Sequence, residues 1–239
     1  MNWRPEAVRL AAIGVPIVLV AVVGAWLVGR GTPTQSASPA ALPTPSGPQA
    51  ARPRATATAG APVLVAPDSA TITAPGAPVI VVEFLDFECE ACGAVYPIIE
   101  DLRQKYAGEV TFVARYFPLD GHFNSRRAAA AVESAGRQGK WEEMYQKMFE
   151  TQPKWGGAGT PLDALFRGYA EELGLAIPRY AADYASQEVA DRVQKDVDDG
   201  LALGVQGTPT FFINGEKFEP KSVEDFSSTL DDALAADGS

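Results

Sequence analysis

The chain has two cysteines, Cys89 and Cys92, and only two residues separate them. If this pair opens a helix, the side chains lie one turn apart on the same side, near the ~5.5–6 Å Cα separation that a disulfide prefers. Such a pair can both form and break a disulfide bond. A sulfur at the helix start faces free N–H groups and the positive end of the dipole, which stabilise a thiolate. We therefore predict that Cys89 is the attacking sulfur of a thiol-disulfide exchange and Cys92 the resolving one.

Two other uses of the cysteine pair fit the sequence less well. A tetrahedral metal site requires more thiolate or imidazole ligands than Cys89, Cys92 and His122, the one histidine, provide. A permanent disulfide across so short a loop constrains the unfolded chain very little, so it stabilises a fold less than a longer loop does. The pattern favours a redox centre, with no metal and no other cofactor, over a static bridge.

The residues around the cysteines show strand and helix patterns in turn. Segment 78–86 is β-branched and apolar on both faces, which is typical of a strand buried on both sides of a sheet. Apolar residues at helical spacing follow over 89–106, and Gly108 is a plausible stop. The alternating segment 110–117 predicts a second strand, ended by Pro118. This order predicts a parallel strand pair, with the cysteines at the first strand-to-helix junction.

Glu83 is the one charged residue among the apolar residues of the first predicted strand. An unpaired carboxylate buried there would be costly, and its pKa would be raised. An acid of this kind beneath the cysteines could accept the proton of Cys92 and return it as the disulfide opens and forms. The pattern alone is equally consistent with a carboxylate on a sheet face that reaches water.

A block of helices is predicted after the second strand, because the sequence becomes rich in alanine, glutamate, arginine and leucine. Helix start and stop signals, with Thr160 as one cap, place these helices over 125–138, 140–151, 161–173, 178–185 and 187–203.

Strand patterns return near the end of the chain. Segments 210–213 and 216–218 flank Asn214-Gly215, which is the sequence of a two-residue hairpin turn. Ser222 and Asp225 then form a capping pattern that opens a last helix.

Three segments, in order along the chain, resemble motifs of the DsbA-like oxidoreductases of the thioredoxin superfamily. The first, 83–92 (EFLDFECEAC), is similar to their active-site segment, including an acid six positions before the first cysteine. The last, 204–215 (GVQGTPTFFING), resembles the loop that carries a cis-proline opposite the disulfide. Between them, 117–119 (FPL), His122 and 138–145 (QGKWEEMY) are similar to the helical insertion of this branch.

The resemblance implies both a fold and a set of site residues. The fold is α/β, a thioredoxin fold over residues 63–239 with a helical insertion at about 120–204. The Thr208–Pro209 peptide bond is expected to be cis, and the backbone beside it to bind an extended substrate. A proline that merely begins a strand is the plainer alternative. The resemblance also favours the proton-transfer role for Glu83.

The sequence departs from the best-known oxidising members between the cysteines, where Glu90 and Ala91 replace Pro-His. The loss of a cation and the gain of an acid should make the Cys89 thiolate less stable, and the protein a weaker oxidant. We expect this dipeptide to tune the reduction potential. His122, in a Gly-His-Phe-Asn turn, is interpreted as a hydrogen-bonding turn residue.

The N-terminal part has the composition of a membrane anchor and a tether. No charged residue occurs in 10–29, a run long enough to cross a bilayer as a helix and longer than the core of a signal peptide. The basic residues favour a cytoplasmic segment 1–9 and an extracytoplasmic location for the rest. Residues 30–62, rich in proline, alanine and threonine, are expected to form a disordered linker.

Charge and resemblance together indicate the class of partner. The first 62 residues carry five arginines and one glutamate, so the net charge of −10 leaves −14 on the remainder, which disfavours nucleic acid. The resemblance implies disulfide exchange with secreted or membrane proteins, in the oxidising direction, with recycling by a quinone-linked DsbB-like or VKOR-like membrane oxidase. The alternatives are a reductase or isomerase on the same scaffold and a non-catalytic peptide-binding adaptor with a passive disulfide.

Overall fold

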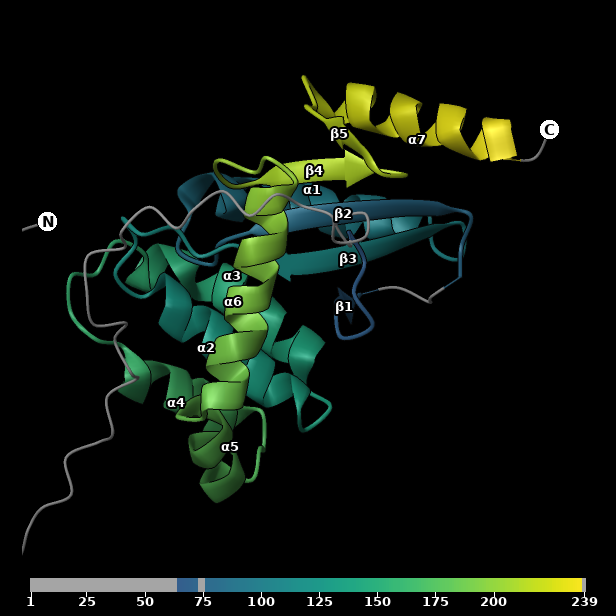
Figure 1. Ribbon diagram of the computed structural model, residues 1–239. Helices are drawn as coiled ribbons and strands as arrows, with labels where there is room; N and C mark the ends of the chain where they lie inside the picture. The colour runs from purple at the N-terminus through teal and green to yellow at the C-terminus, as the bar shows by residue number, and fades with distance from the viewer. Residues whose placement is uncertain (1–63, 73–75, 238–239) are drawn as a thin grey trace, which may run out of the picture. The chain divides into compact units, whose positions relative to one another are not determined.

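The structure, a computed structural model, describes residues 64–72 and 76–237. The predicted membrane anchor at 10–29 and the predicted linker at 30–62 lie outside these residues. Within the described ranges, no helix is long and apolar enough to cross a bilayer. A central sheet and seven helices make up the described domain (Figure 1).

The sheet has five strands in the order β1-β3-β2-β4-β5. β2 and β3 are parallel, as the sequence predicts, and the other neighbours are antiparallel. The strands are β1 Ala70–Thr71, β2 Val79–Leu85, β3 Val110–Tyr116, β4 Thr210–Ile213 and β5 Glu216–Phe218. The prediction missed only β1, because two residues are too few to show an alternating pattern.

The helical block lies between β3 and β4, so the expected insertion into the α/β fold is confirmed. The helices are α1 Glu90–Lys105, α2 Ser125–Gly136, α3 Trp141–Trp155, α4 Asp163–Glu172, α5 Ile177–Tyr184, α6 Gln187–Ala202 and α7 Val223–Asp237.

Most of the predicted helix boundaries differ from the observed ones by one or two residues, and the predicted end of α3 differs by four. α3 continues past Thr151 to Trp155, because Trp155 is only 2% exposed and its burial stabilises the last turn. α4 begins at Asp163 and not after a Thr160 cap. The segment before α4 is held by Asn124 instead, whose side chain donates to the Thr160 carbonyl and accepts from the Leu162 N–H.

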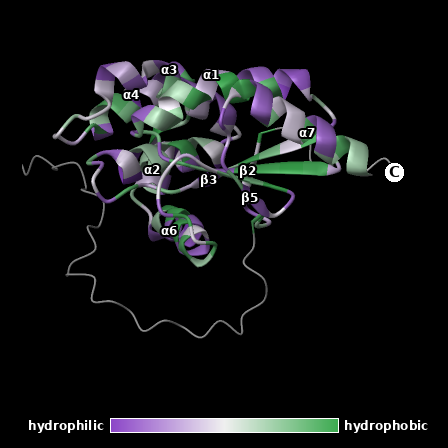
Figure 2. Ribbon diagram, turned by 90° about the horizontal axis from the view of Figure 1, so that it is seen from above, coloured by the Kyte–Doolittle hydropathy of each residue, from purple (hydrophilic) through white to green (hydrophobic). Residues whose placement is uncertain are grey.

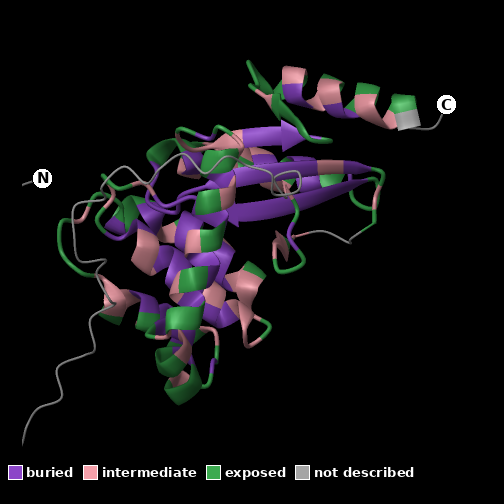
Figure 3. Ribbon diagram, in the orientation of Figure 1, coloured by how far each residue is buried: buried purple, intermediate pink, exposed green. Residues whose placement is uncertain are grey.

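Helices cover both faces of the sheet (Figure 2). α1 and α7 pack on one face, and α6 packs on the other, where its Val197 belongs to the same cluster as Phe84 and Phe212. Figure 3 shows β2 and β3 buried along nearly their whole length, which agrees with the doubly apolar pattern of segment 78–86. The central strand β2 therefore delivers the cysteines from within the core.

The C-terminal turn and cap follow the predicted chemistry. Asn214 and Gly215 have φ of 48° and 94°, the left-handed values that a two-residue hairpin turn requires. The Asn214 side chain also accepts a hydrogen bond from the Ile80 N–H at 2.8 Å, which joins the hairpin to β2. Ser222 caps α7 by accepting from the Asp225 N–H at 3.1 Å.

A buried ionic cluster ties α6 to the sheet. Asp196 is 0% exposed and pairs with Arg115 of β3 and with Arg192, one turn before it on α6. The same carboxylate accepts from the Tyr116 N–H at 3.0 Å. Arg192 in turn donates to the Asp68 carbonyl oxygen at 2.7 Å, so the segment before β1 is held to α6.

Candidate functional site: the Cys89–Cys92 redox centre

Cys89 caps α1 and Cys92 lies in its first turn. The Cys89 backbone is extended, with φ of −70° and ψ of 119°, and the helix begins at Glu90. Both cysteines are free thiols, so the structure represents the reduced form. Cys89 is 8% exposed and Cys92 is 0% exposed. Only the first sulfur is therefore within reach of a partner.

The surroundings move the pKa values of the two sulfurs in opposite directions. The pKa of Cys89 is lowered to about 5, mainly by the hydrogen bond from the Cys92 thiol, against the opposing effect of burial. Thr208 and the N–H groups of Cys92 and Ala91 lower it further. Burial raises the pKa of Cys92, and the hydrogen bond to Cys89 and the charge of Glu83 add to this. Near neutral pH, Cys89 is thus a thiolate and Cys92 a thiol.

Thr208 lies against the sulfur of Cys89. The Cys89 thiol donates to the Thr208 carbonyl oxygen at 3.4 Å, and the Thr208–Pro209 peptide bond is cis, as the resemblance implies. The Thr208 hydroxyl is buried and has no hydrogen-bond partner in the described part of the chain. Once Cys89 ionises it can no longer donate, and a hydroxyl beside it is a suitable donor to the thiolate.

Glu83 occupies the middle of β2, opposite Ala114 of β3 and Phe211 of β4. It is 6% exposed, and its carboxyl makes no hydrogen bond or ion pair with any residue of 64–72 or 76–237. Burial raises its pKa to about 8, and the nearby charges of Glu100 and Cys89 contribute. The carboxyl is therefore mostly protonated at neutral pH, and when it does ionise, its charge raises the pKa of Cys92.

Glu90 and Ala91, between the cysteines, are both exposed on the first turn of α1. Solvent and salt screen the interaction of an exposed carboxylate with a neighbouring thiolate. The structure thus places the dipeptide beside the reactive sulfur but in contact with water.

Asp86, just after β2, links the redox centre to the chain that follows β3. Its carbonyl oxygen accepts from the Cys89 N–H at 3.1 Å. Its carboxylate accepts from the N–H groups of Glu88 at 2.9 Å and Leu119 at 3.0 Å. The same carboxylate lies 2.6 Å from Nδ1 of His122. The turn that carries His122 is thereby fixed against the start of α1.

Glu88 fixes the same loop to the helical insertion. Its side chain is buried, and it accepts from the Asn124 N–H at 2.6 Å and from the Gly157 N–H at 3.2 Å. These two donors lie before α2 and after α3. The insertion is therefore a structural support of the redox centre.

Gln152 of α3 supports the cysteine loop from the other side. Its amide donates to the carbonyl oxygens of Phe87 and Cys89, each at 2.8 Å. The glutamine packs so closely on α1 that a Cβ built on Gly93 would lie 1.9 Å from its Oε1. Gly93 is thus the residue that leaves room for Gln152.

Our sequence reasoning missed the structural roles of Asp86, Glu88 and Gln152. The two acids have a signal, because they alternate with Phe87 in an apolar run next to the cysteines, where buried charge is costly. Gln152 has no such signal in the sequence, since a polar residue on a helix is ordinarily exposed.

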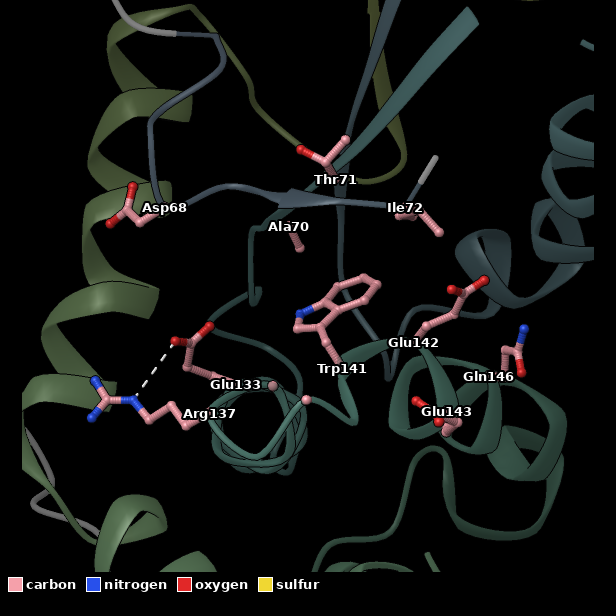
Figure 4. Close-up of a pocket in the computed structure, with 12 residues that line it drawn as sticks. Asp68, Ala70, Thr71, Ile72, Glu133, Arg137, Trp141, Glu142, Glu143 and Gln146 are labelled. Carbon is pink, nitrogen blue, oxygen red and sulfur yellow. Dashed lines mark ion pairs between the residues drawn. The ribbon is translucent and has the colours of Figure 1, made fainter. Parts of the chain in front are cut away.

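A pocket of about 760 Å³ opens elsewhere, between β1 and helices α2 and α3. Figure 4 shows Trp141 at its centre, with Glu133 directed toward Arg137. Neither cysteine contributes to this pocket, so it is separate from the redox centre.

Comparison with known proteins identifies the family. The family model described as "Thioredoxin" matches residues 66–232. Among curated proteins, the Na(+)/H(+) antiporter NhaA 3 of Salinispora tropica is 37% identical over 177 residues, 73% of this chain and 26% of the relative. NhaA 1 of Salinispora arenicola is 38% identical over 176 residues, which are 72% of this chain and 26% of the relative. The chain thus spans about a quarter of the length of these relatives.

Solved structures show the same fold. Alpha-DsbA1 of Wolbachia pipientis has a TM-score of 0.66 at 20% identity, over 73% of this chain and 95% of that one. Oxidised BdbD of Bacillus subtilis has a TM-score of 0.62 at 24% identity, over 69% of this chain and 92% of that one. A thioredoxin-like oxidoreductase from Silicibacter pomeroyi has a TM-score of 0.60 at 25% identity, over 73% of this chain and 95% of that one. The chain belongs to the thioredoxin family and is a thiol-disulfide oxidoreductase of DsbA-like fold, with its Cys-x-x-Cys centre at Cys89 and Cys92.

Proposed function

We propose that this oxidoreductase introduces disulfides into secreted or membrane proteins. The observation that carries the proposal is the stabilised thiolate of Cys89, whose pKa is lowered to about 5. A stable thiolate stabilises the reduced form of the protein, and an oxidoreductase with a stable reduced form is a good electron acceptor.

The exchange proceeds in two steps that together move two electrons. A substrate thiolate attacks the Cys89 sulfur, the Cys89–Cys92 bond breaks, and Cys92 leaves and takes a proton. A second substrate thiolate then attacks the substrate sulfur of the mixed disulfide, and Cys89 leaves as a thiolate. The substrate gains a disulfide, and the protein gains two electrons and the one proton now on Cys92.

Glu83 supplies that proton. Its carboxyl is buried and protonated near neutral pH, because its pKa is raised to about 8. A neutral acid in this position can donate to the departing Cys92 and recover the proton when the disulfide forms again. The charge of an ionised Glu83 raises the pKa of Cys92, and this effect supports the pairing.

Thr208 and Pro209 form the proposed substrate-binding edge. The Thr208 carbonyl oxygen lies 3.4 Å from the attacking sulfur, at the position where the backbone of an extended peptide can hydrogen-bond to the loop. The Thr208 hydroxyl is the further group available to the thiolate.

We place the catalytic domain outside the cytoplasmic membrane, anchored through residues 10–29, and recycled by a quinone-linked DsbB-like or VKOR-like membrane oxidase. The apolar segment and the composition of 30–62 support the anchor. Proteolysis of intact cells stripped of their wall tests the location: digestion of the domain without lysis agrees with it, and protection until lysis contradicts it.

Oxidation of a fluorescent dithiol peptide tests the reaction. The oxidised domain should oxidise the peptide much faster than glutathione disulfide alone, and Cys92→Ala should accumulate mixed disulfides with cell-surface proteins through Cys89. Cys89→Ala is the matched control and should trap none. Reduction of disulfide peptides without dithiol oxidation would favour a reductase, and inactivity in both directions would favour the peptide-binding adaptor.

A further inference from the structure

His122 lies where its charge can act on the reactive sulfur. It belongs to the segment between β3 and α2, and its N–H donates to the Leu119 carbonyl oxygen at 3.0 Å. Its Nδ1 lies 2.6 Å from the Asp86 carboxylate, which is itself 0% exposed. The Asp86 carbonyl oxygen accepts from the Cys89 N–H at 3.1 Å, so one residue joins the imidazole to the sulfur-bearing residue.

We propose that His122 is a positioning residue whose imidazolium, held by Asp86, stabilises the Cys89 thiolate from outside the Cys-x-x-Cys segment. The segment itself provides no cation, since Glu90 and Ala91 lie between the cysteines. This inference rests on the proposed exchange through Cys89 and adds a residue that sets the stability of the reduced form.

The charges that face His122 are those of Asp86, Cys89 and Glu88. Burial is the largest single effect and opposes the charged imidazole, but the hydrogen bond and charge of Asp86 together with the charges of Cys89 and Glu88 outweigh it, so the His122 pKa is raised. Glu88 is hydrogen-bonded to the Asn124 and Gly157 N–H groups, which disperse its charge. The Asp86 carboxylate likewise accepts from the Glu88 and Leu119 N–H groups, and it also lies 2.6 Å from Nδ1 of His122, whose positive charge offsets that of the carboxylate.

The imidazolium acts on the step in which Cys89 is the leaving group. As the second substrate sulfur attacks, the bond between Cys89 and the substrate breaks and its electron pair goes to the Cys89 sulfur. A nearby positive charge stabilises that thiolate and speeds its departure, without any proton leaving His122. The pair of electrons comes from the substrate, so no further reactant is required.

Reciprocity gives this role a signature that a merely structural residue lacks. If protonated His122 stabilises the thiolate, the thiolate must raise the His122 pKa by the same free energy. The disulfide carries no charge and cannot do so. The His122 pKa should therefore be higher in the reduced protein than in the oxidised protein.

His122 is the only histidine of the sequence, so imidazole NMR signals of the untagged domain report it alone. We expect the reduced protein to show a His122 pKa clearly above that of the oxidised protein. The control is Cys89→Ser under reducing conditions, which has no thiolate and should return the value of the oxidised form. Equal pKa values in the oxidised and reduced wild-type protein would overturn the proposal.

A second measurement uses the thiolate itself. His122→Gln keeps a hydrogen-bonding group but removes the charge, and should lower the acid dissociation constant of Cys89 about two- to fivefold, the range for a partly exposed ion pair. His122→Lys restores a cation and should recover part of that loss. A Cys89 titration of the folded His122→Gln protein that superimposes on the wild type would contradict the proposal. Oxidation of the dithiol peptide, measured on the same samples, distinguishes the role of His122 from the proposed oxidase function. If the protein does not oxidise the peptide but its His122 pKa still depends on the redox state, only the oxidase function is refuted.

Discussion

The sulfur of Cys89 lies 3.4 Å from the carbonyl oxygen of Thr208, which follows it in the chain by 119 positions. The thiol can donate to this oxygen, whereas a thiolate cannot. Loss of the proton therefore leaves the carbonyl of Thr208 without that donor at the moment when the sulfur becomes reactive. An approaching peptide can provide a new donor, its own backbone N–H, at the same place.

The contrast between the two sulfurs predicts their alkylation by iodoacetamide. Cys89, with its pKa lowered to about 5, should reach half its maximal rate near pH 5, and its rate should be nearly constant above pH 7. Cys92, which is 0% exposed and has a raised pKa, should remain slow throughout. Mass spectrometry of the labelled peptides measures both rates, and comparable rates for the two residues would contradict the assignment of the attacking sulfur.

Glu83→Gln should slow turnover at proton transfer, because the amide keeps the shape of the carboxyl but cannot supply a proton. Stopped-flow measurement of dithiol oxidation between pH 5 and 9 reports the effect. Glu100→Gln is a control, since Glu100 is an acid on α1 that also acts on Glu83 but lies outside the proposed transfer. Unchanged rates for Glu83→Gln across this range would reduce Glu83 to a packing residue.

The same substitution should raise stability at neutral pH. In the unfolded chain Glu83 ionises above about pH 4.5, but in the folded protein only above about pH 8. The folded state thus binds more protons between these values, and stability is lost as pH rises through the window. Glu83→Gln removes this penalty, up to about 3 kcal/mol at pH 7. Urea unfolding at pH 4 and pH 7 measures it, and an equal stability difference at both pH values would contradict the raised pKa.

The residues between the cysteines should tune the redox potential. Glu90→Pro with Ala91→His removes an acid and adds a cation next to Cys89, so the Cys89 pKa should fall and the protein should become more oxidising. One pKa unit corresponds to about 30 mV for the two-electron couple, and the exposure of both positions makes the expected shift smaller than in a buried site. Thiolate absorbance against pH and equilibration with glutathione measure the two effects.

The control for this double variant is Ala94→His, which adds a histidine at another exposed position on α1. It should leave the potential closer to that of the parent. If the double variant is no more oxidising than the parent protein, the dipeptide does not set the potential.

The ionic cluster around Asp196 should be important for stability. Asp196→Ala leaves the guanidinium groups of Arg115 and Arg192 without their shared buried carboxylate, which should cost about 3–5 kcal/mol. Asp198→Ala is the matched control on the exposed side of α6, and its effect should stay within about 0.5 kcal/mol. Chemical denaturation distinguishes the two, and equal losses would show that burial of the cluster is unimportant.

The sequence was sufficient for elements whose side chains show a local period. Segment 78–86 and the helix after it could be predicted, because burial on both faces of β2 and on one face of α1 leaves a regular apolar pattern. The Thr160 cap was wrong for the opposite reason: Asn124, far away in the chain, determines how that segment is held. No local pattern carries that information.

The residues of the site likewise divide into those that the local sequence pattern predicts and those that it does not. The cysteines and Glu83 could be singled out from their types and their neighbours. The supporting contacts could not, because Asp86 binds Leu119 and His122, and Glu88 binds Asn124 and Gly157, all more than thirty positions away. Such pairings depend on how the helical insertion packs against the cysteine loop. The type of one residue and its neighbours in the sequence do not reveal this packing.

The close approach of Gln152 to Gly93 has an evolutionary consequence. A β-carbon at 93 would meet the end of the glutamine side chain, so the two positions cannot drift independently. Descendants that gain a side chain at 93 must shorten or redirect residue 152 and thereby lose the amide that holds Phe87 and Cys89. Covariation of these two positions among homologous sequences would identify the homologues in which residue 152 of α3 still holds the cysteine loop, and those in which another residue must hold it.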